Sequence, residues 1–190
     1  MSGFAAVGLY LVSLFFELII FTFWLRIALR FLRISSLNPL NQMVGNITNP
    51  IIHPILSLFK QKYQQGEQYD WMAFSILILI EFLKVLCVGL IIYHSFVPLN
   101  YIVLHILADL IVQPCNLLFY AILIRVVMSY ANPGWQHPAA NFLRLLTEPL
   151  LFQARKLIPN IFGFDFSPFI IMVVLKVIIL FINASLPWKL

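Results

Sequence analysis

Four long apolar runs constrain this chain more than any other feature of its sequence. They cover about residues 4–33, 71–94, 99–130 and 166–186, with few charged residues inside them. A run of about 20 apolar residues is long enough to cross the hydrocarbon core of a bilayer as a helix. Hydrophobic residues make up 62% of the chain and charged residues 10%, against roughly 45–50% and 25% in soluble domains. These values exclude the soluble classes and predict an all-α integral membrane protein with four spans.

Basic residues predict how these spans are oriented. Lys and Arg gather in the two long connections and beside the spans that enter them, at Arg26, Arg30, Arg33, Lys60, Lys62, Arg125, Arg144, Arg155 and Lys156. The short link at residues 94–98 contains none. Because cytoplasmic loops carry the excess of Lys and Arg, both long loops are predicted to be cytoplasmic and both termini outward. The short link predicts that the second and third spans are antiparallel neighbours.

An internal repeat divides the chain into two halves. One constant offset of 99 positions relates Arg26, Asn38, Pro39, Thr48 and Pro50 to Arg125, His137, Pro138, Thr147 and Pro149. A second offset of 92 positions relates Ser75 to Ser167 and Lys84 to Lys176. We therefore interpret residues 1–95 and 96–190 as tandem parallel repeats. Each would contain a span, a basic end, a proline-bounded loop and a second span.

The two loops, about residues 38–62 and 137–158, carry helix signals. Asn38 before Pro39 is a typical helix start, with a capping side chain followed by proline in the first turn. Pro50 disfavours helical geometry at the residue before it, so a first short helix is predicted to end at Asn49. Each loop is therefore predicted to form a hairpin of two short amphipathic helices, either on the cytoplasmic leaflet or re-entrant. Pro114 is expected to kink the third span.

Several of these motif residues resemble a known family. The pattern consists of Arg26, Asn38-Pro39, Thr48-Asn49-Pro50, Arg125, Thr147-Glu148-Pro149 and Asp165-Phe166-Ser167-Pro168 within two repeats. It resembles the YggT (YlmG) family, small membrane proteins of bacteria and plastids. The resemblance implies a role like that of the plastid relatives in cytochrome assembly and nucleoid organisation, or of the bacterial ones in envelope or osmotic stress. It also implies a place in a bacterial inner (plasma) membrane, and it implies no catalytic residue.

Five ionisable residues fall inside the predicted spans: Glu17, Glu81, Lys84, Asp109 and Lys176. A charge at the bilayer centre is unfavourable by roughly 2.5–3.5 kcal/mol on insertion scales, so such residues face other helices and find partners. Glu81 and Lys84 are three residues apart and share a helix face. Glu17 and Asp109 remain as partners for Lys176. The five residues are predicted to form a buried charge network, which either fixes the helix pairing or lines an ion path.

Other polar residues leave further alternatives open. His94 and His105 could face each other across the short link and bind haem or another metal, or they could bond only to water and headgroups. Arg26, Arg30 and Arg33 line one face at a helix end, where they can bind anionic headgroups or the carbonyls of helix ends.

Signatures of catalysis are missing from the sequence, which contains no zincin, nucleophile-elbow, Walker A or dinucleotide motif. No cofactor, metal site or nucleic-acid contact is predicted, and Cys87 and Cys115 show no disulfide or metal spacing. The leading hypothesis is a non-enzymatic accessory or scaffold factor of the envelope with an unknown membrane-protein partner. The alternative is a small-cation transporter or channel, and a homo-oligomer is left open in both cases.

Overall fold

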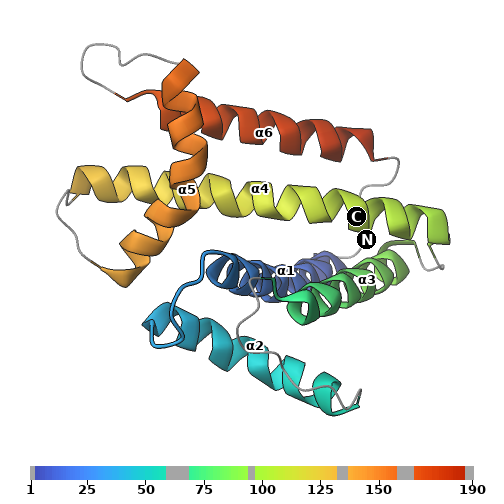
Figure 1. Cartoon of the computed structure of the whole chain (residues 1–190). Coiled ribbons are helices and arrows are strands. Elements are labelled where there is room, and N and C mark those ends of the chain that lie inside the picture. Colours follow the sequence, from blue (N-terminus) through green and yellow to red (C-terminus); the bar gives the residue numbers. More distant parts are fainter. Residues whose placement is uncertain (1–2, 59–68, 94–96, 132–136, 158–164, 187–190) are drawn as a thin grey trace.

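The computed structural model describes residues 3–58, 69–93, 97–131, 137–157 and 165–186. Over these ranges the chain forms six α-helices and no β-strand (Figure 1). They are α1 (Gly3–Phe31), α2 (Pro39–Leu58), α3 (Trp71–Tyr93), α4 (Leu99–Ala131), α5 (Pro138–Leu157) and α6 (Ser167–Ser185). By length and composition, α1, α3, α4 and α6 are candidate membrane spans, in agreement with the four apolar runs of the sequence.

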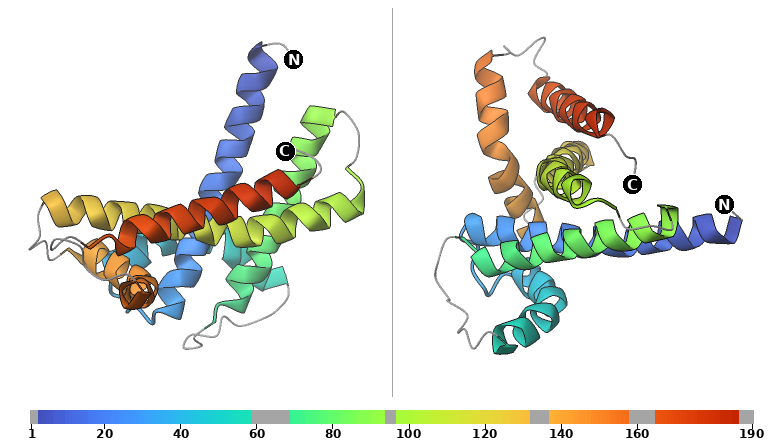
Figure 2. Two further views of the ribbon diagram at one scale, coloured as in Figure 1. Left: turned by 90° about the horizontal axis from the view of Figure 1, so that it is seen from above. Right: turned by 90° about the vertical axis from the view of Figure 1, so that its right-hand side faces the viewer.

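The four spans form two pairs that run across each other. α1 packs along α3 and α4 packs along α6, while α4 also contacts α1 and α3. Both views of Figure 2 show the α1–α3 pair lying crosswise to the α4–α6 pair. The prediction that the second and third spans are antiparallel neighbours is therefore wrong. α3 and α4 meet but cross, because α4 makes its most extensive contact with α6.

Apolar cores lie where the helices meet. The largest joins α1, α2 and α3 and consists of Ile20, Phe23, Ile52, Leu56, Ala73, Ile76, Leu77 and Ile80. A second joins α1, α2 and α5 through Leu29, Val44 and Phe142. Because lipid tails are as apolar as leucine, burying these side chains between spans adds little stability by itself. Packing and polar contacts therefore decide which helices meet.

The end of α1 sets the direction in which α2 leaves. The N–H of Ile34 donates to the carbonyl of Leu29 at 3.0 Å, and the N–H of Arg33 donates to that of Arg30 at 2.9 Å. This pair of bonds is the Schellman motif, which needs a left-handed residue after the helix. Arg33 takes that conformation with a φ of 52°, which is unfavourable for a residue other than glycine. The Ile34 side chain then packs beside Leu29 and holds the turn.

The structure corrects the predicted hairpins. α2 continues as one helix through Pro50 and Pro54, and α5 continues through Pro149. A proline removes one helical hydrogen bond but does not forbid the helix, and the buried face of α2 favours continuation. Val44, Ile52 and Leu56 lie eight and four residues apart, so a single helix places all of them on one buried face. The third span likewise continues as one helix through Pro114.

Both amphipathic helices begin where the sequence indicates. The Asn38 side chain accepts a hydrogen bond from the N–H of Leu40 at 3.0 Å, directly before α2. The His137 ring nitrogen accepts one from the N–H of Ala139 at 3.2 Å, directly before α5. From this start α5 lies across α4 and α6, as Figure 1 shows, and it contacts both. Each amphipathic helix is thereby placed beside the arginine of the preceding span.

Candidate functional site

The first polar cluster forms around Arg26, near the end of α1. Its Nη1 donates to the Thr48 hydroxyl and, at 2.8 Å, to the side-chain oxygen of Asn49, while its Nε donates to Asp70 Oδ2 at 3.1 Å. Arg30 approaches the same Asp70 oxygen at 3.0 Å. Because a guanidinium presents several donors in a fixed plane, one residue can join three helices. We call Arg26, Thr48, Asn49, Asp70 and Arg30 the first clamp.

Asp70 is the carboxylate that both arginines of the first clamp contact. Its side chain is 1% exposed, and one of its carboxylate oxygens accepts from two arginines. The other oxygen accepts the N–H of Ala73 at 3.0 Å, which caps the first turn of α3. Sequence reasoning missed this residue, although an aspartate directly before an apolar run is a common helix start. Asp70 therefore ties the beginning of α3 to the end of α1.

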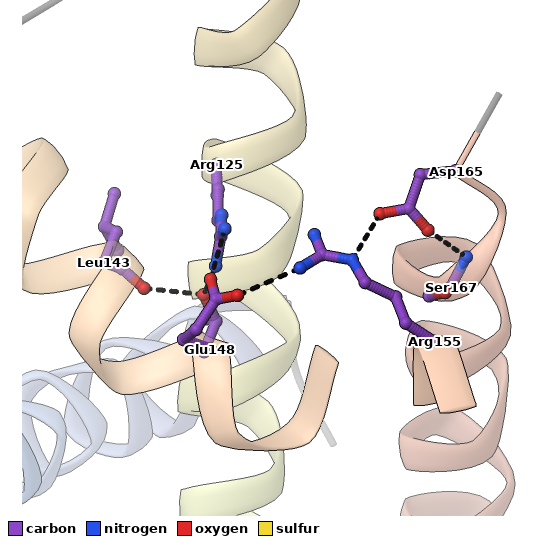
Figure 3. A network of polar contacts seen from close by, with 7 residues as sticks. Arg125, Leu143, Glu148, Arg155, Asp165 and Ser167 are labelled. Carbon is purple, nitrogen blue, oxygen red and sulfur yellow. Dashed lines mark hydrogen bonds and ion pairs between the residues drawn. The ribbon is translucent and has the colours of Figure 1, made fainter. Parts of the chain in front are cut away.

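The second clamp forms around Arg125, near the end of α4 (Figure 3). Its Nη1 donates to the Thr147 hydroxyl at 2.8 Å, and its Nη2 donates to Glu148 Oε2 at 2.6 Å. Arg155 then bridges onward, with Nη1 donating to Glu148 Oε1 at 2.9 Å and Nε donating to Asp165 Oδ2 at 2.8 Å. These contacts connect α4 to α5 and α5 to the residues before α6. The sequence pattern placed Arg125, Thr147 and Glu148 together but gave Arg155 no role.

The two clamps share one geometry. In each, the threonine lies 22 residues after the arginine that bonds to it. Each threonine hydroxyl also donates to a carbonyl one turn back, at Val44 or Leu143. Each clamp also includes an aspartate that caps the first turn of a span. Asp165 Oδ1 accepts the N–H of Ser167 at 3.0 Å, as Asp70 accepts the N–H of Ala73. The structure thus brings the motif residues of each half together at a single point.

The carboxylates of the second clamp are held in their charged form. Hydrogen bonding from Arg125 is the main cause that lowers the pKa of Glu148 below its ordinary 4.5. Burial raises the pKa of Asp165, but hydrogen bonds from Arg155 and Ser167 outweigh it and leave the pKa below 3.8. The two arginines and two carboxylates balance in charge. The contacts of the second clamp are therefore mainly structural.

A third polar cluster lies between α3 and α4. Lys84 Nζ is 2.8 Å from Asp109 Oδ2 and 3.6 Å from Glu81 Oε2. Glu81 is fully buried, and neither of its carboxylate oxygens accepts a hydrogen bond within the described residues. Two acids thus share one lysine in a membrane span, so the cluster carries one excess negative charge when both are ionised.

The prediction of one buried network of five residues needs correction. Asp109, which was offered as a partner for Lys176, pairs instead with Lys84 across the α3–α4 contact. Glu17 is not buried but exposed on α1. Lys176 lies half-buried on α6, with its Nζ 4.5 Å from the centre of the Phe119 ring. The reason is the helix order, because α6 packs on α4 and α5 whereas α1 packs on α2, α3 and α4.

The predicted histidine pair includes His94, which lies outside the described residues. His105 is buried in α4, where its Nδ1 donates to the carbonyl of Tyr101 at 2.9 Å. Among the described residues, no group of three His, Cys, Asp or Glu side chains is placed to hold a metal ion. Cys87 and Cys115 are free thiols.

A cavity of about 610 Å³ lies beside the second clamp, between α4, α5 and α6. Arg125, Arg155 and Asp165 line it together with apolar side chains such as Phe169 and Met172. The lining is mostly apolar with a charged part, which suits an amphiphile more than a small polar substrate.

The fold and these clamps define a class: a helical membrane protein of four spans whose connecting helices are fastened to the span ends by arginines. Comparison with known proteins then gives the family. The CCB3/YggT family model matches residues 104–186. The chain belongs to the CCB3/YggT family.

Similarity to individual relatives extends over most of the chain. It is 29% identical to the uncharacterized protein YggT of Escherichia coli over 170 residues, which cover 89% of this chain and 85% of the relative. It is 30% identical to an uncharacterized protein of Haemophilus influenzae over 160 residues, covering 84% and 80%. An uncharacterized protein of Pseudomonas aeruginosa is 25% identical over 182 residues, covering 94% and 89%. No solved structure matches the chain.

Proposed function

We propose that the protein is a non-enzymatic accessory or scaffold factor of the bacterial inner membrane that helps to hold or assemble another membrane protein. The observation that carries this proposal is the fastening of two amphipathic helices to the span ends. Arg26 fixes α2 and Arg125 fixes α5. Both helices still expose large apolar side chains, namely Met43, Ile47, Leu145 and Phe152. A fixed apolar surface fits a partner helix or lipid better than it fits a reacting substrate.

The proposal includes an orientation and a repeat. The halves 1–95 and 96–190 are tandem parallel repeats, and both clamps lie at the cytoplasmic face with the termini outward. The equal spacing from arginine to threonine in the two clamps supports the repeat. The basic residues around the clamps support the orientation. Arg144 and Lys156 are exposed on α5, where they would meet anionic headgroups.

Site-specific photo-crosslinking in intact cells tests the scaffold role. A benzophenone amino acid would replace Ile47 on α2 or Phe152 on α5, both more than half exposed. Leu79 on α3, 48% exposed in a span, is the matched control. We expect a reproducible adduct with one membrane protein at Ile47 or Phe152 and not at Leu79. The same adducts at all three positions, or adducts with lipid alone, would contradict the proposal.

One specific observation favours a second candidate function, the transport of a small cation or proton. Glu81 is a fully buried carboxyl group without a hydrogen bond in the described part of the chain, next to Lys84 and Asp109. Ionisable groups inside membrane spans often mark ion or proton pathways. The remainder of the site is structural, so this candidate ranks below the first.

Flux in proteoliposomes separates the two functions. Wild-type protein would be compared with Lys84→Met and Asp109→Asn, and with Lys156→Met as a control outside the cluster. Cation or proton flux that is lost in folded Lys84→Met and Asp109→Asn but kept in Lys156→Met would establish transport. Equal background flux in all four proteins would leave the cluster as a contact between helices.

A further inference from the structure

Two charged side chains in the spans have no ion-pair partner within the described part of the chain. Glu17 is exposed on α1. Lys176 on α6 contacts the Phe119 ring, and no ion pair among the described residues includes it or Glu17. The attraction between the Lys176 cation and an aromatic ring offsets only part of the free-energy cost of placing this charge in a span. Both charges sit in segments that lipid would otherwise surround, so each calls for an opposite charge.

The described residues do not match these two charges with each other or with a neighbour. Lys84 lies 2.8 Å from Asp109 and 3.6 Å from Glu81, so two other acids already surround it. Three acids on the α1–α3–α4 side therefore share one lysine. Lys176 lies on a helix that packs on α4 and α5. Within the described residues, the acids around α1 thus exceed the lysine beside them, and α6 carries a lysine without an acid.

The two charges lie at matching distances from the clamps. Glu17 precedes Arg26 of the first clamp by nine residues, and Lys176 follows Ser167, bonded in the second clamp, by nine residues. With a rise of 1.5 Å per residue, each charge lies about 14 Å along its helix from its clamp. If the clamps are at one face of the membrane, helices of equal tilt place both charges at the same depth.

We propose that a second copy of this chain covers both Glu17 and Lys176, so that Glu17 of each copy pairs with Lys176 of the other. A two-fold symmetric dimer forms this contact twice and neutralises all four charges. Apolar side chains on the same faces extend the contact, with Tyr10 and Phe21 beside Glu17. Val173 and Leu180 lie beside Lys176 and are 46% and 66% exposed. A lipid or a different protein could complement one of the charges, whereas a second copy complements both at one depth.

Disulfide crosslinking between differently tagged copies tests the contact. Cys87 and Cys115 would be changed to serine, one copy would carry Glu17→Cys and the other Lys176→Cys, and membranes would be mildly oxidised. We expect a product of twice the mass that contains both tags. The control pair, Leu18→Cys with Val177→Cys, starts from residues 59% and 58% exposed at nearly the same depth and should give clearly less.

Three results of the crosslinking would overturn the dimer. One is no product above the control pair. Another is a disulfide within a single chain that carries both Glu17→Cys and Lys176→Cys, seen at the monomer mass. The last is an adduct of Glu17→Cys with a different protein. Elution of each variant at the wild-type volume in detergent would show that it is folded.

Exchange of the charges tests the pairing itself. Glu17→Lys and Lys176→Glu alone should each weaken association, measured by energy transfer between labelled copies in vesicles, by at least about tenfold, because each leaves like charges opposed. The double variant should recover association to near the wild-type value. A double variant as weak as the single variants, or single variants as strong as wild type, would show that these charges do not meet.

Discussion

Replacing Arg26 with methionine should destabilise the fold more than the same replacement at Arg125. Arg26 donates hydrogen bonds to Thr48, Asn49 and Asp70, and its side chain is 11% exposed. The Asp70 side chain is 1% exposed, so this contact is almost dry. Arg125 donates two hydrogen bonds, and its side chain is 21% exposed. Because the two clamps are alike in sequence, a difference in destabilisation between the two variants would come from the hydrogen bonds and burial of each arginine.

The contacts that remain after substitution set the magnitude. A hydrogen bond to a charged group contributes about 1.5–3 kcal/mol, but contributions within one network do not add fully. After Arg26→Met, Asp70 keeps Arg30 at 3.0 Å, so no buried charge is left alone. We expect a loss of about 3 kcal/mol in the free energy of unfolding. For Arg125→Met we expect about 1 kcal/mol, because Glu148 is 47% exposed and keeps a second arginine.

Unfolding by a denaturing detergent, followed by tryptophan fluorescence in mixed micelles, would measure both losses. Arg26→Lys and Arg125→Lys are the matched controls, because lysine keeps the charge but lacks the planar set of donors. Arg26→Lys should recover only part of the loss at the first clamp. Equal destabilisation by the two methionine variants, or a larger effect of Arg125→Met, would refute the reasoning.

Three further predictions follow from other contacts. The lowered pKa values of Glu148 and Asp165 mean that their contacts stabilise the folded state at pH values above the ordinary pKa values of 4.5 and 3.8. This stabilisation is lost as the pH falls through the lowered pKa values. Thermal unfolding between about pH 6 and pH 3 should therefore show a steeper loss of stability in wild type than in Glu148→Gln. Lys84→Met removes the cation between Glu81 and Asp109 inside a span. Unfolding in micelles should show a loss of about 3–5 kcal/mol in the free energy of unfolding. Pro50→Ala and Pro149→Ala should raise stability, by at most about 3 kcal/mol each, because both helices are continuous, and a fall would contradict this.

The sequence predicted those features that depend on local periodicity. Apolar runs of spanning length identified the four spans, because length and hydropathy alone determine whether a helix can cross a bilayer. Asn38 and His137 marked the starts of α2 and α5, since capping depends on a single side chain. The repeat offset also brought Arg125, Thr147 and Glu148 into one group, and the structure places these three in contact.

The sequence did not predict features that depend on which helices meet. Pro50 was expected to end a helix, but the packing of Ile52 and Leu56 against α1 and α3 favours its continuation. The position of Asp70 before an apolar run is typical of a helix start, but its two arginine partners lie 44 and 40 positions away and could not be predicted from the sequence. Glu17 was grouped with the buried charges because it lies in an apolar run. Periodicity within one helix does not reveal whether a given face meets protein or lipid.

Helix lengths explain how two crossing pairs can occupy one bilayer. At 1.5 Å per residue, α1 with 29 residues and α4 with 33 are about 44 and 50 Å long, well above a hydrocarbon core of about 30 Å. Such helices can span while tilted steeply in opposite directions. α6 has 19 residues and is only about 29 Å long, so the same tilt leaves its apolar length short of the core. Helices with this mismatch associate with others, which gives the surface around Lys176 a reason to meet protein in place of lipid.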